Sequence, residues 1–310
     1  MAKEKIGEVI KSNKPPSYFV SKPPSIFKLF LRELKHDYFA LVSGIILILL
    51  LLAIFIGAPI VNYHHDVMWA TPQPGNLPVS PEASGTIFGL DNLGRNQFNL
   101  LFVAARNSLF IAFGVTFFSF ILGLTIGVVS GFYGGRIDNI LMRITDTWSM
   151  VPFLMIVIVL FMIFGRTIQL FIFFLTIFTW TGRARLLRAA SLSQRQLDYI
   201  SASKTLGTRN VVIIFREMLP NLVDVAVANF VLTMSANIGI ETGLSLLGFG
   251  LGWDFPSLGT MMQNAVRTTF LIHFPWTWAP AMALCLILML CVNFVGNALQ
   301  RVADPRQRFA

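Results

Sequence analysis

Residues 41–61 read LVSGIILILLLLAIFIGAPIV, a run of 21 positions without a single charge. A helix needs about 20 consecutive apolar residues to cross the hydrocarbon core of a bilayer, so this run predicts a membrane-spanning helix. A polar and basic segment precedes it, and the run is longer than the apolar part of a cleaved signal peptide. We therefore expect residues 41–61 to be retained as the first span of an integral membrane protein.

The remainder of the chain has the same apolar character. Of its 310 residues, 55% are hydrophobic and only 13% are charged, and the mean hydropathy is +0.68. Such a composition excludes an ordinary soluble domain. Five further apolar runs predict five more spans, so the expected fold is all-α with six transmembrane helices. These runs are residues 107–130, 144–164, 168–187, 222–241 and 278–300.

The positions of the basic residues predict the orientation, because Lys and Arg concentrate in short cytoplasmic loops. With the N-terminus inside, the inner segments are 1–40, 131–143, 183–220 and 301–310. These segments hold all of the 24 Lys and Arg except Arg95, Arg106, Arg166 and Arg267. The sequence therefore predicts an N-in, C-in topology, which also accounts for the net charge of +9. Basic residues spread over four loops argue against nucleic-acid binding.

This topology divides the chain into a cytoplasmic basic tail (1–40), the first span (41–61), an extracytoplasmic loop (62–106), a transmembrane core (107–300) and a second cytoplasmic tail (301–310). The core includes a cytoplasmic loop at 188–220. The outer loops contain Trp69, Trp253 and Trp276, which suggest either a receiving surface for another protein or anchors at the lipid interface.

The inner loop is unusual because its segment 199–221, YISASKTLGTRNVVIIFREMLPN, is charged and broken by glycine between two apolar spans. Ser193 and Gln196 form a capping-box pattern that can open a helix, and Gly207 can end it in a left-handed conformation. Thr208 can cap a second helix, which Pro220 is expected to end. The second helix would be anchored by an apolar face of Val211, Val212, Phe215, Met218 and Leu219. Such a helix pair could lie on the inner leaflet or dock onto a cytosolic partner.

This loop resembles the cytoplasmic "EAA" loop of binding-protein-dependent ABC importer permeases. The matching residues are Ala202, Gly207, Leu219, Pro220 and Asn221. Ser201 stands where the family usually has Glu, Ser203 where it has the second Ala, and Glu217 where many members have His.

Other motifs are similar to those of the C-type subunit of oligopeptide and dipeptide permeases. They are GLDNLGR (89–95), ARNSL (105–109), GFYGGRID (131–138), LSLLGFG (244–250), GTM (259–261) and the pair GN (296–297) followed by DPR (304–306). Six motifs in the expected order make the resemblance specific.

The resemblance implies a type I ABC importer permease of the cell membrane, a transport subunit rather than an enzyme. Its implied partners are a second homologous permease subunit, one or two ABC ATPase subunits, an extracytoplasmic substrate-binding protein and a peptide substrate. The sequence contains no G-x-x-x-x-G-K-[ST] loop, so we expect ATP and Mg²⁺ to bind the ATPase and no cofactor to bind this chain. The residues expected to couple to the ATPase are Ser201, Ala202, Gly207, Arg216, Glu217, Leu219 and Pro220.

Within the spans, Ser119, Gly123, Gly127 and Gly131 recur every four residues and predict a ridge for close helix packing. Polar residues recur at the same spacing in the span 222–241 and either line a translocation pathway or bond to a neighbouring helix. These candidates are Asn229, Thr233 and Asn237, together with Glu241 at the outer end of the span. Asp146 is expected to pair with Arg143 one turn away.

Two alternatives to peptide import stay open at this stage. Relatives in the same family import nickel, but His64, His65 and Asp66 are thin evidence for metal ligands, because adjacent residues rarely converge on one ion. We therefore predict no metal site. A stand-alone channel or secondary carrier belongs to a different class, and a carrier would be expected to bury ionisable residues in mid-membrane. The sequence places almost none there.

Overall fold

The computed structural model describes residues 37–61, 77–252 and 255–303. Residues 1–36 of the basic tail, Trp69 and Trp253 of the outer loops, the candidates His64, His65 and Asp66, and the motif at 304–306 lie outside these ranges. The main helices are α3 (Tyr38–Ile60), α5 (Gln97–Tyr133), α6 (Gly135–Ser149), α7 (Phe153–Phe164), α8 (Ile168–Thr179), α9 (Thr181–Arg195), α12 (Leu219–Leu246) and α15 (Ala279–Ala303).

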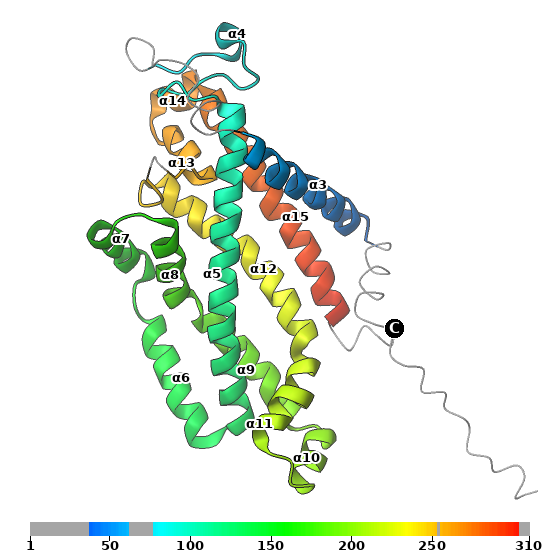
Figure 1. Cartoon of the computed structure of the whole chain (residues 1–310). Helices are drawn as coiled ribbons and strands as arrows, with labels where there is room; N and C mark the ends of the chain where they lie inside the picture. Colours follow the sequence, from blue (N-terminus) through cyan, green and yellow to red (C-terminus); the bar gives the residue numbers. More distant parts are fainter. Residues whose placement is uncertain (1–36, 62–76, 253–254, 304–310) are drawn as a thin grey trace, which may run out of the picture.

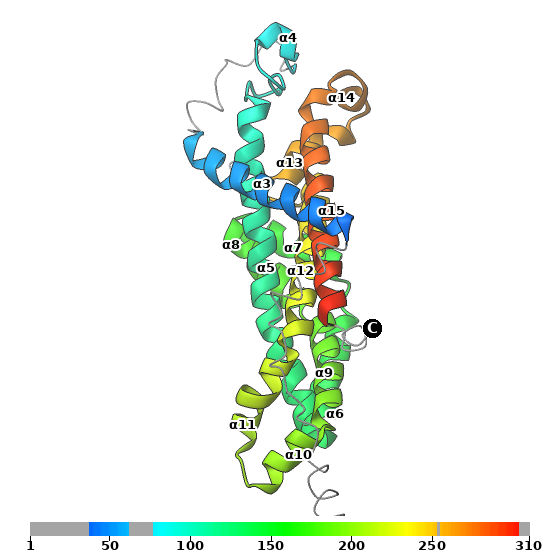
Figure 2. The same cartoon turned by 90° about the vertical axis from the view of Figure 1, so that its right-hand side faces the viewer.

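Short helices gather at the two ends of an elongated bundle (Figures 1 and 2). One end carries α4 (Pro81–Ser84), α13 (Leu258–Met262), the 3₁₀ turns η3 (Gln263–Val266) and η4 (Pro275–Thr277), and α14 (Thr268–His273). The opposite end carries α10 (Asp198–Thr205), α11 (Asn210–Ile213) and the π-helical turn η2 (Ile214–Met218). We call these the α14 end and the α10 end. Helix α5 runs from one end to the other.

Several helices are suited to a membrane. Among the described residues, α3, α5 and α15 are long and apolar enough to cross a bilayer, and two bent pairs, α6 with α7 and α8 with α9, bring the candidates to five. Helix α12 occupies the predicted span 222–241 but is not among them. The chain is thus an all-helical membrane protein, and the count of six crossings stays a prediction.

The prediction of one continuous helix over residues 144–164 is wrong. The chain bends by 72° between α6 and α7, where Pro152 precedes the first residue of α7. Proline has no backbone N–H to continue the helix and disfavours helical geometry in the residue before it. This break redirects the apolar α7 away from the axis of α6.

The predicted span 168–187 is also broken, by a bend of 47° between α8 and α9. The guanidinium group of Arg183 donates to the carbonyl oxygen of Thr179. In a continuous helix that carbonyl would accept from the backbone N–H of Arg183 instead. A side chain inserted into the backbone hydrogen-bond ladder is an established cause of helix kinks.

Helix α5 begins ten residues earlier than the predicted start at residue 107, so residues 97–106 are helical. The side chain of Asn96 caps the helix, and its Oδ1 accepts from the N–H groups of Phe98 at 3.0 Å and Asn99 at 3.4 Å. The hydropathy pattern misses this first part because polar residues interrupt it, whereas the cap fixes the actual start.

The glycine ridge of α5 lies against α9. A Cβ atom on Gly127 would lie 2.6 Å from the carbonyl oxygen of Ala184 and 3.0 Å from the backbone nitrogen of Arg188. A Cβ on Gly123 would lie 2.7 Å from Cβ of Arg183, and one on Gly131 would collide with Ser191. The absence of side chains along this line lets the two backbones approach closely. Ser119, the first member of the ridge, is fully buried.

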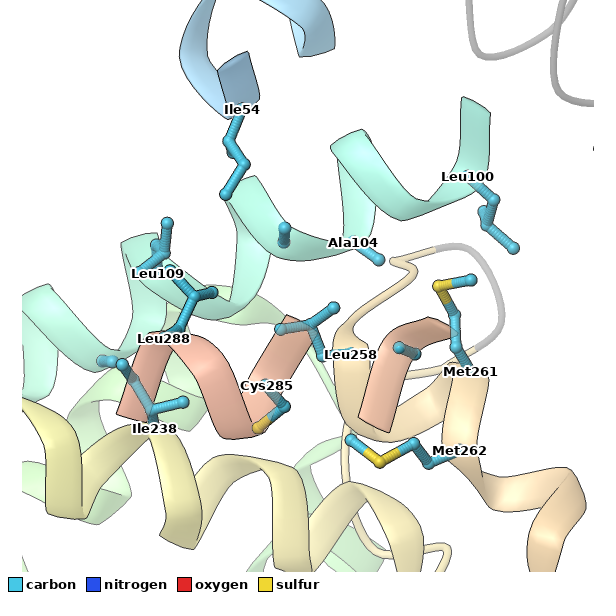
Figure 3. Packing of buried hydrophobic residues seen from close by; sticks show 13 residues of the cluster. Ile54, Leu100, Ala104, Leu109, Ile238, Leu258, Met261, Met262, Cys285 and Leu288 are labelled. Carbon is cyan, nitrogen blue, oxygen red and sulfur yellow. The ribbon is translucent and has the colours of Figure 1, made fainter. Parts of the chain in front are cut away.

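A second packing centre joins α3, α5, α12, α13 and α15 near the α14 end. Figure 3 shows its labelled side chains, which come from helices far apart in the sequence. They include Ile54 of α3, Leu109 of α5, Ile238 of α12, Leu258 of α13 and Leu288 of α15, all of them buried. This cluster holds the short helix α13 against the long helices.

The start of α3 and the end of α15 are in contact. Asp37 caps α3 by accepting from the N–H of Ala40 at 3.1 Å, and its carboxylate also pairs with the guanidinium group of Arg301. The hydrogen bond from Ala40, together with the charge of Arg301, lowers the pKa of Asp37 despite some burial. The first and last long helices therefore have these two ends on the same side of the bundle.

Candidate functional site

The α10 end is built around a sharp turn at Gly207. Its φ of +78° lies in the left-handed region, and no described atom lies within 4 Å of the position of a Cβ, so backbone conformation rather than space requires glycine. The N–H of Gly207 donates to the carbonyl of Lys204 at 3.0 Å, and the N–H of Thr208 donates to that of Ser203 at 3.1 Å. This pair of bonds is a Schellman motif that ends α10. We call residues 198–218 the elbow.

Two short helices joined at Gly207 agree with the sequence prediction, but their predicted caps are wrong. Ser193 lies inside α9, and Gln196 is the residue that ends it. Helix α10 begins after Leu197 and receives no side-chain cap from any described residue. Likewise Arg209, not Thr208, precedes α11. The capping-box pattern failed because α9 continues through it.

The prediction that Pro220 ends the second helix is also wrong. Helix α11 continues through η2 into α12, and the N–H of Leu219 donates to the carbonyl of Ile214, five residues earlier. Pro220 falls in the first turn of α12, where the wider π turn accommodates a residue without an N–H. The side chain of Asn221 donates to the carbonyl of Glu217 at 2.7 Å. Residues 210–246 are therefore one uninterrupted helical rod.

The face that anchors the elbow differs from the predicted one. Ile200, Ile213 and Met218 are fully buried, and together with Ile214 they pack against Phe132 of α5 and Leu222 of α12. By contrast, Val211, Val212 and Phe215 point outward, with Phe215 65% exposed. Only Met218 and the half-buried Leu219 of the predicted face turn inward.

The elbow thus presents apolar side chains that no described residue covers. Leu206 at the turn is 84% exposed, and Val211 is 58% exposed. We call Leu206, Val211, Val212 and Phe215 the elbow patch. Exposed apolar groups clustered at the end of a protein indicate a contact surface.

Polar contacts hold the two arms of the elbow together. The hydroxyl of Ser203 donates to Oε2 of Glu217 at 2.7 Å, so two of the three positions that depart from the family pattern form a direct pair. The hydroxyl of Tyr199 donates to Oε1 of Gln194 at 2.7 Å, and burial raises its pKa. Lys204 lies 4.8 Å from the centroid of the Phe132 ring, and burial together with the nearby charge of Arg195 lowers its pKa.

The predicted coupling residues lie in the elbow, except for Leu219 and Pro220, which form the adjoining first turn of α12. Ser201, Ala202, Gly207, Arg216 and Pro220 are exposed, whereas Glu217 and Leu219 are half-buried. The structure therefore brings all seven together on one compact element at one end of the bundle.

The polar stripe of α12 divides into two parts. Asn237 is 1% exposed, and its Nδ2 donates to Oγ1 of Thr116 on α5 at 2.8 Å. Asn229 and Thr233 are half-buried, and Oδ1 of Asn229 has no hydrogen-bond partner among the described residues. Glu241 is fully buried against α5. The α10-side half of the stripe thus keeps accessible surface that the other half lacks.

One charged site escaped the sequence analysis. Asp138 at the start of α6 accepts from both Nε and an Nη of Arg188 on α9, at 2.5 Å and 2.6 Å, and also from the hydroxyl of Ser130 on α5. This bidentate pair joins three helices near the elbow. The partner predicted for Asp146 is wrong, because Asp146 pairs with Arg185 at 2.9 Å instead of Arg143. Long-range pairs of this kind leave no local signal in the sequence.

Metal ligands do not gather anywhere in the ranges 37–61, 77–252 and 255–303, where no three His, Cys, Asp or Glu side chains come together as a possible site. Cys285 and Cys291 are buried free thiols.

These features define a helical membrane permease with an exposed apolar elbow at one end of its bundle. The chain belongs to the family described as the binding-protein-dependent transport system inner membrane component, which matches residues 123–309. It is a transport subunit of a membrane importer and not an enzyme.

Curated relatives extend the similarity over most of the chain. The oligopeptide transport system permease protein OppC of Lactococcus lactis subsp. cremoris (strain SK11) is 41% identical over 276 residues, covering 89% of this chain and 93% of the relative. The dipeptide transport system permease protein DppC of Bacillus subtilis (strain 168) is 34% identical over 277 residues, covering 89% of this chain and 85% of the relative.

A solved structure supports the fold. A chain of the MetNI methionine ABC transporter, from a study of its inward-facing conformations, has a TM-score of 0.53 and 23% sequence identity, covering 66% of this chain and 96% of that chain. The type I ABC importer fold expected from the sequence is therefore confirmed, while the number and orientation of the crossings remain predictions.

Proposed function

We propose that this chain imports oligopeptides or dipeptides as one of two homologous permease subunits in an ABC importer. The relatives that are 41% and 34% identical are named as oligopeptide and dipeptide permeases, which supports peptide as the cargo. An extracytoplasmic substrate-binding protein delivers the peptide, and one or two ABC ATPase subunits supply the energy. The observation that carries the proposal is the elbow, which offers an uncovered apolar patch on a rigid extension of α12.

The proposed topology has six crossings, with both termini and the elbow in the cytoplasm. The contact between Asp37 and Arg301 supports placing the start of α3 and the end of α15 at the same membrane face. The basic residues of segments 131–143 and 183–220 support a cytoplasmic position for the α10 end. The α14 end, with its short helices, then faces the substrate-binding protein.

In this arrangement the elbow is the contact with the ATPase. Ser201, Ala202, Gly207, Arg216, Glu217, Leu219 and Pro220 form or position the contact surface, and ATP and Mg²⁺ bind the ATPase while this chain binds no cofactor. The helical rod from residue 210 to 246 is about 55 Å long at about 1.5 Å per residue. Movement of the elbow with the ATPase is thereby transmitted along the rod to the opposite end of the bundle.

The translocation pathway in this proposal runs beside α12. Asn229 and Thr233 are the members of the polar stripe with accessible surface, so they face the pathway directly. Asn237 and Glu241 contribute by holding α12 against α5. The ridge of Ser119, Gly123, Gly127 and Gly131 serves helix packing against α9.

A pair of substitutions at Gly207 tests the coupling. Gly207→Pro forces φ to about −65° and removes the N–H that bonds to Lys204, so we expect loss of both co-purification with the ATPase and ATP-driven uptake. Gly207→Asn is the matched control, because asparagine tolerates the left-handed conformation. A Gly207→Pro chain that still binds the ATPase and supports normal transport would refute the proposed role of the elbow.

The cargo is tested by uptake into vesicles that contain the complete importer. We expect ATP-dependent accumulation of labelled peptides and none of radiolabelled Ni²⁺, the cargo of the alternative within the same family. Accumulation of Ni²⁺ without peptide would assign the chain to nickel import. Accumulation of cargo by this chain alone, without any ATPase, would instead indicate a channel or secondary carrier.

A further inference from the structure

The side chain of Glu241 has no exposed surface, because its helix α12 contacts the rest of the bundle on several sides. Both of its carboxyl oxygens accept hydrogen bonds. Oε2 accepts from the hydroxyl of Ser108 on α5 at 2.8 Å, and Oε1 accepts from the hydroxyl of Ser245, one turn further along α12, at 2.8 Å. The carboxyl group therefore ties two long helices together.

The same two serines reach the short helix α13. The backbone N–H of Leu258 donates to Oγ of Ser108 at 3.0 Å, and the hydroxyl of Ser257 lies 3.5 Å from that of Ser245. Each carboxyl oxygen of Glu241 is thus connected, through the hydroxyl of one serine, to the start of α13. We call these two connections the arms of the carboxyl group. Asn107 adds a bond from its Nδ2 to the carbonyl of Pro256 at 2.8 Å.

Helix α13 lies so close to α12 that nothing else fits between them. A Cβ atom on Gly259 would collide with Ser245 and would lie 2.7 Å from the carbonyl oxygen of Thr242. On the apolar side, Leu258, Met261 and Met262 of α13 are buried in the cluster shown in Figure 3. Glu241 is consequently enclosed by its own chain and does not meet cargo while α13 is in place.

A carboxyl group in such a position has an energetic cost that an apolar side chain would not have. Burial of a polar group is unfavourable unless hydrogen bonds compensate it, and well-packed apolar residues often replace buried polar networks without loss of stability. What a fully bonded network adds is a single defined arrangement of the segments it joins. Here those segments are α5, α12 and α13.

We propose that Glu241 is a positioning residue that fastens α13 to α5 and α12, so that α13 moves with α12 when the importer changes conformation. The elbow lies at one end of the rod 210–246 and this fastening lies near the other. Glu241 therefore links motion of the elbow to the short helices of the α14 end. The transport part of this inference rests on the proposed function, whereas the fastening itself does not.

The test measures the accessibility of α13 in the complete importer. Met262, which is 3% exposed, is replaced by cysteine in a chain carrying Cys285→Ala and Cys291→Ala. The rate at which a membrane-impermeant maleimide labels this cysteine is then compared between chains with Glu241 intact and chains with Glu241 substituted. We expect Glu241→Leu to raise the rate about tenfold, because both arms lose their acceptor and local opening becomes easier. Glu241→Gln, which keeps the size and one acceptor, should raise it about twofold.

Ser235→Ala is the matched control. This buried serine lies on the same helix but donates to the carbonyl of Met289 on α15 at 3.0 Å, so its loss should leave the labelling rate of α13 unchanged. Should the Glu241→Leu chain fail to assemble, Ser108→Ala and Ser245→Ala each remove one arm, and each should raise the rate about threefold.

Two outcomes would overturn the inference. Unchanged labelling in Glu241→Leu, or in both serine variants, would show that the carboxyl group does not hold α13. Reduced uptake with unchanged labelling would assign Glu241 to contact with cargo instead. Because labelling is read without any substrate, an importer that carries something other than peptide would leave this test intact.

Discussion

Substitution of Gly127 tests the close packing of α5 and α9 most directly. In Gly127→Ala the new Cβ would lie 2.6 Å from the carbonyl oxygen of Ala184, 3.0 Å from the backbone nitrogen of Arg188 and 3.0 Å from Cβ of Leu187. Two of these atoms belong to the backbone, so relief requires the helices to separate. Overpacking of this kind costs about 1–3 kcal/mol, and alanine recovers about 0.5–1 kcal/mol of helix propensity. We expect net destabilisation of about 1–2 kcal/mol.

Gly182→Ala is the matched control, since Gly182 lies inside α9 and no described atom lies within 4 Å of its Cβ position. It should leave stability unchanged or raise it by about 0.5–1 kcal/mol. The assay is the thermal unfolding midpoint of the purified permease in detergent, where Gly127→Ala should unfold a few degrees below the wild type. A Gly127→Ala midpoint equal to or above that of Gly182→Ala would refute the packing argument.

Three further results follow from contacts described above. Asn237→Leu breaks the bond to Thr116 and should lower the uptake rate while the ATPase still co-purifies. Unchanged uptake kinetics would show that transport does not depend on this bond between α12 and α5. Asp138→Asn weakens the bidentate pair with Arg188 and should lower the free energy of unfolding by about 2 kcal/mol. Adding Arg188→Gln to this variant should recover part of the lost stability. Phe215→Ser removes a ring that is 65% exposed, so it should weaken ATPase binding without lowering the thermal unfolding midpoint. A lowered midpoint with normal ATPase binding would contradict the exposed position of this ring.

The long apolar helices could be predicted because hydropathy alone determines them. The runs 41–61 and 278–300 differ from α3 and α15 by only a few residues at each end. The bends escaped prediction because a count of apolar residues carries no information on direction. Pro152 is visible in the sequence, but the apolar run continues on both sides of it and conceals the break.

The elbow was predictable where its chemistry is local. Gly207 marks the turn because left-handed backbone strongly favours glycine, and the helices on both sides follow from it. Pro220 misled because the π-helical turn before it accommodates a residue without an N–H, and the five-residue bond from Leu219 to Ile214 could not be inferred from the sequence. The exposed side of the elbow was misassigned because the predicted face left out Ile213 and Ile214, which turn inward.

Contacts between distant segments lay beyond local sequence patterns. Ser108 and Glu241 are 133 residues apart, and Asp138 and Arg188 are 50 residues apart. No periodicity connects such positions, since each pair forms only after the helices have packed. The sequence made Glu241 a pathway candidate at the outer end of a span, but only the folded chain shows what surrounds it.

The π-helical turn η2 has a geometric consequence for any shortened variant. Such a turn accommodates one more residue than an α-helical turn, and each residue of an α-helix turns the chain by about 100°. Deleting a single residue between 214 and 218 would let the backbone revert to uniform α-helical winding, and Leu206 and Val211 would keep nearly the same azimuth relative to everything beyond Leu219, because the turn holds one surplus residue. The same deletion in the regular α-helical part of α12 would instead rotate Leu206 and Val211 by about 100° relative to the residues that follow.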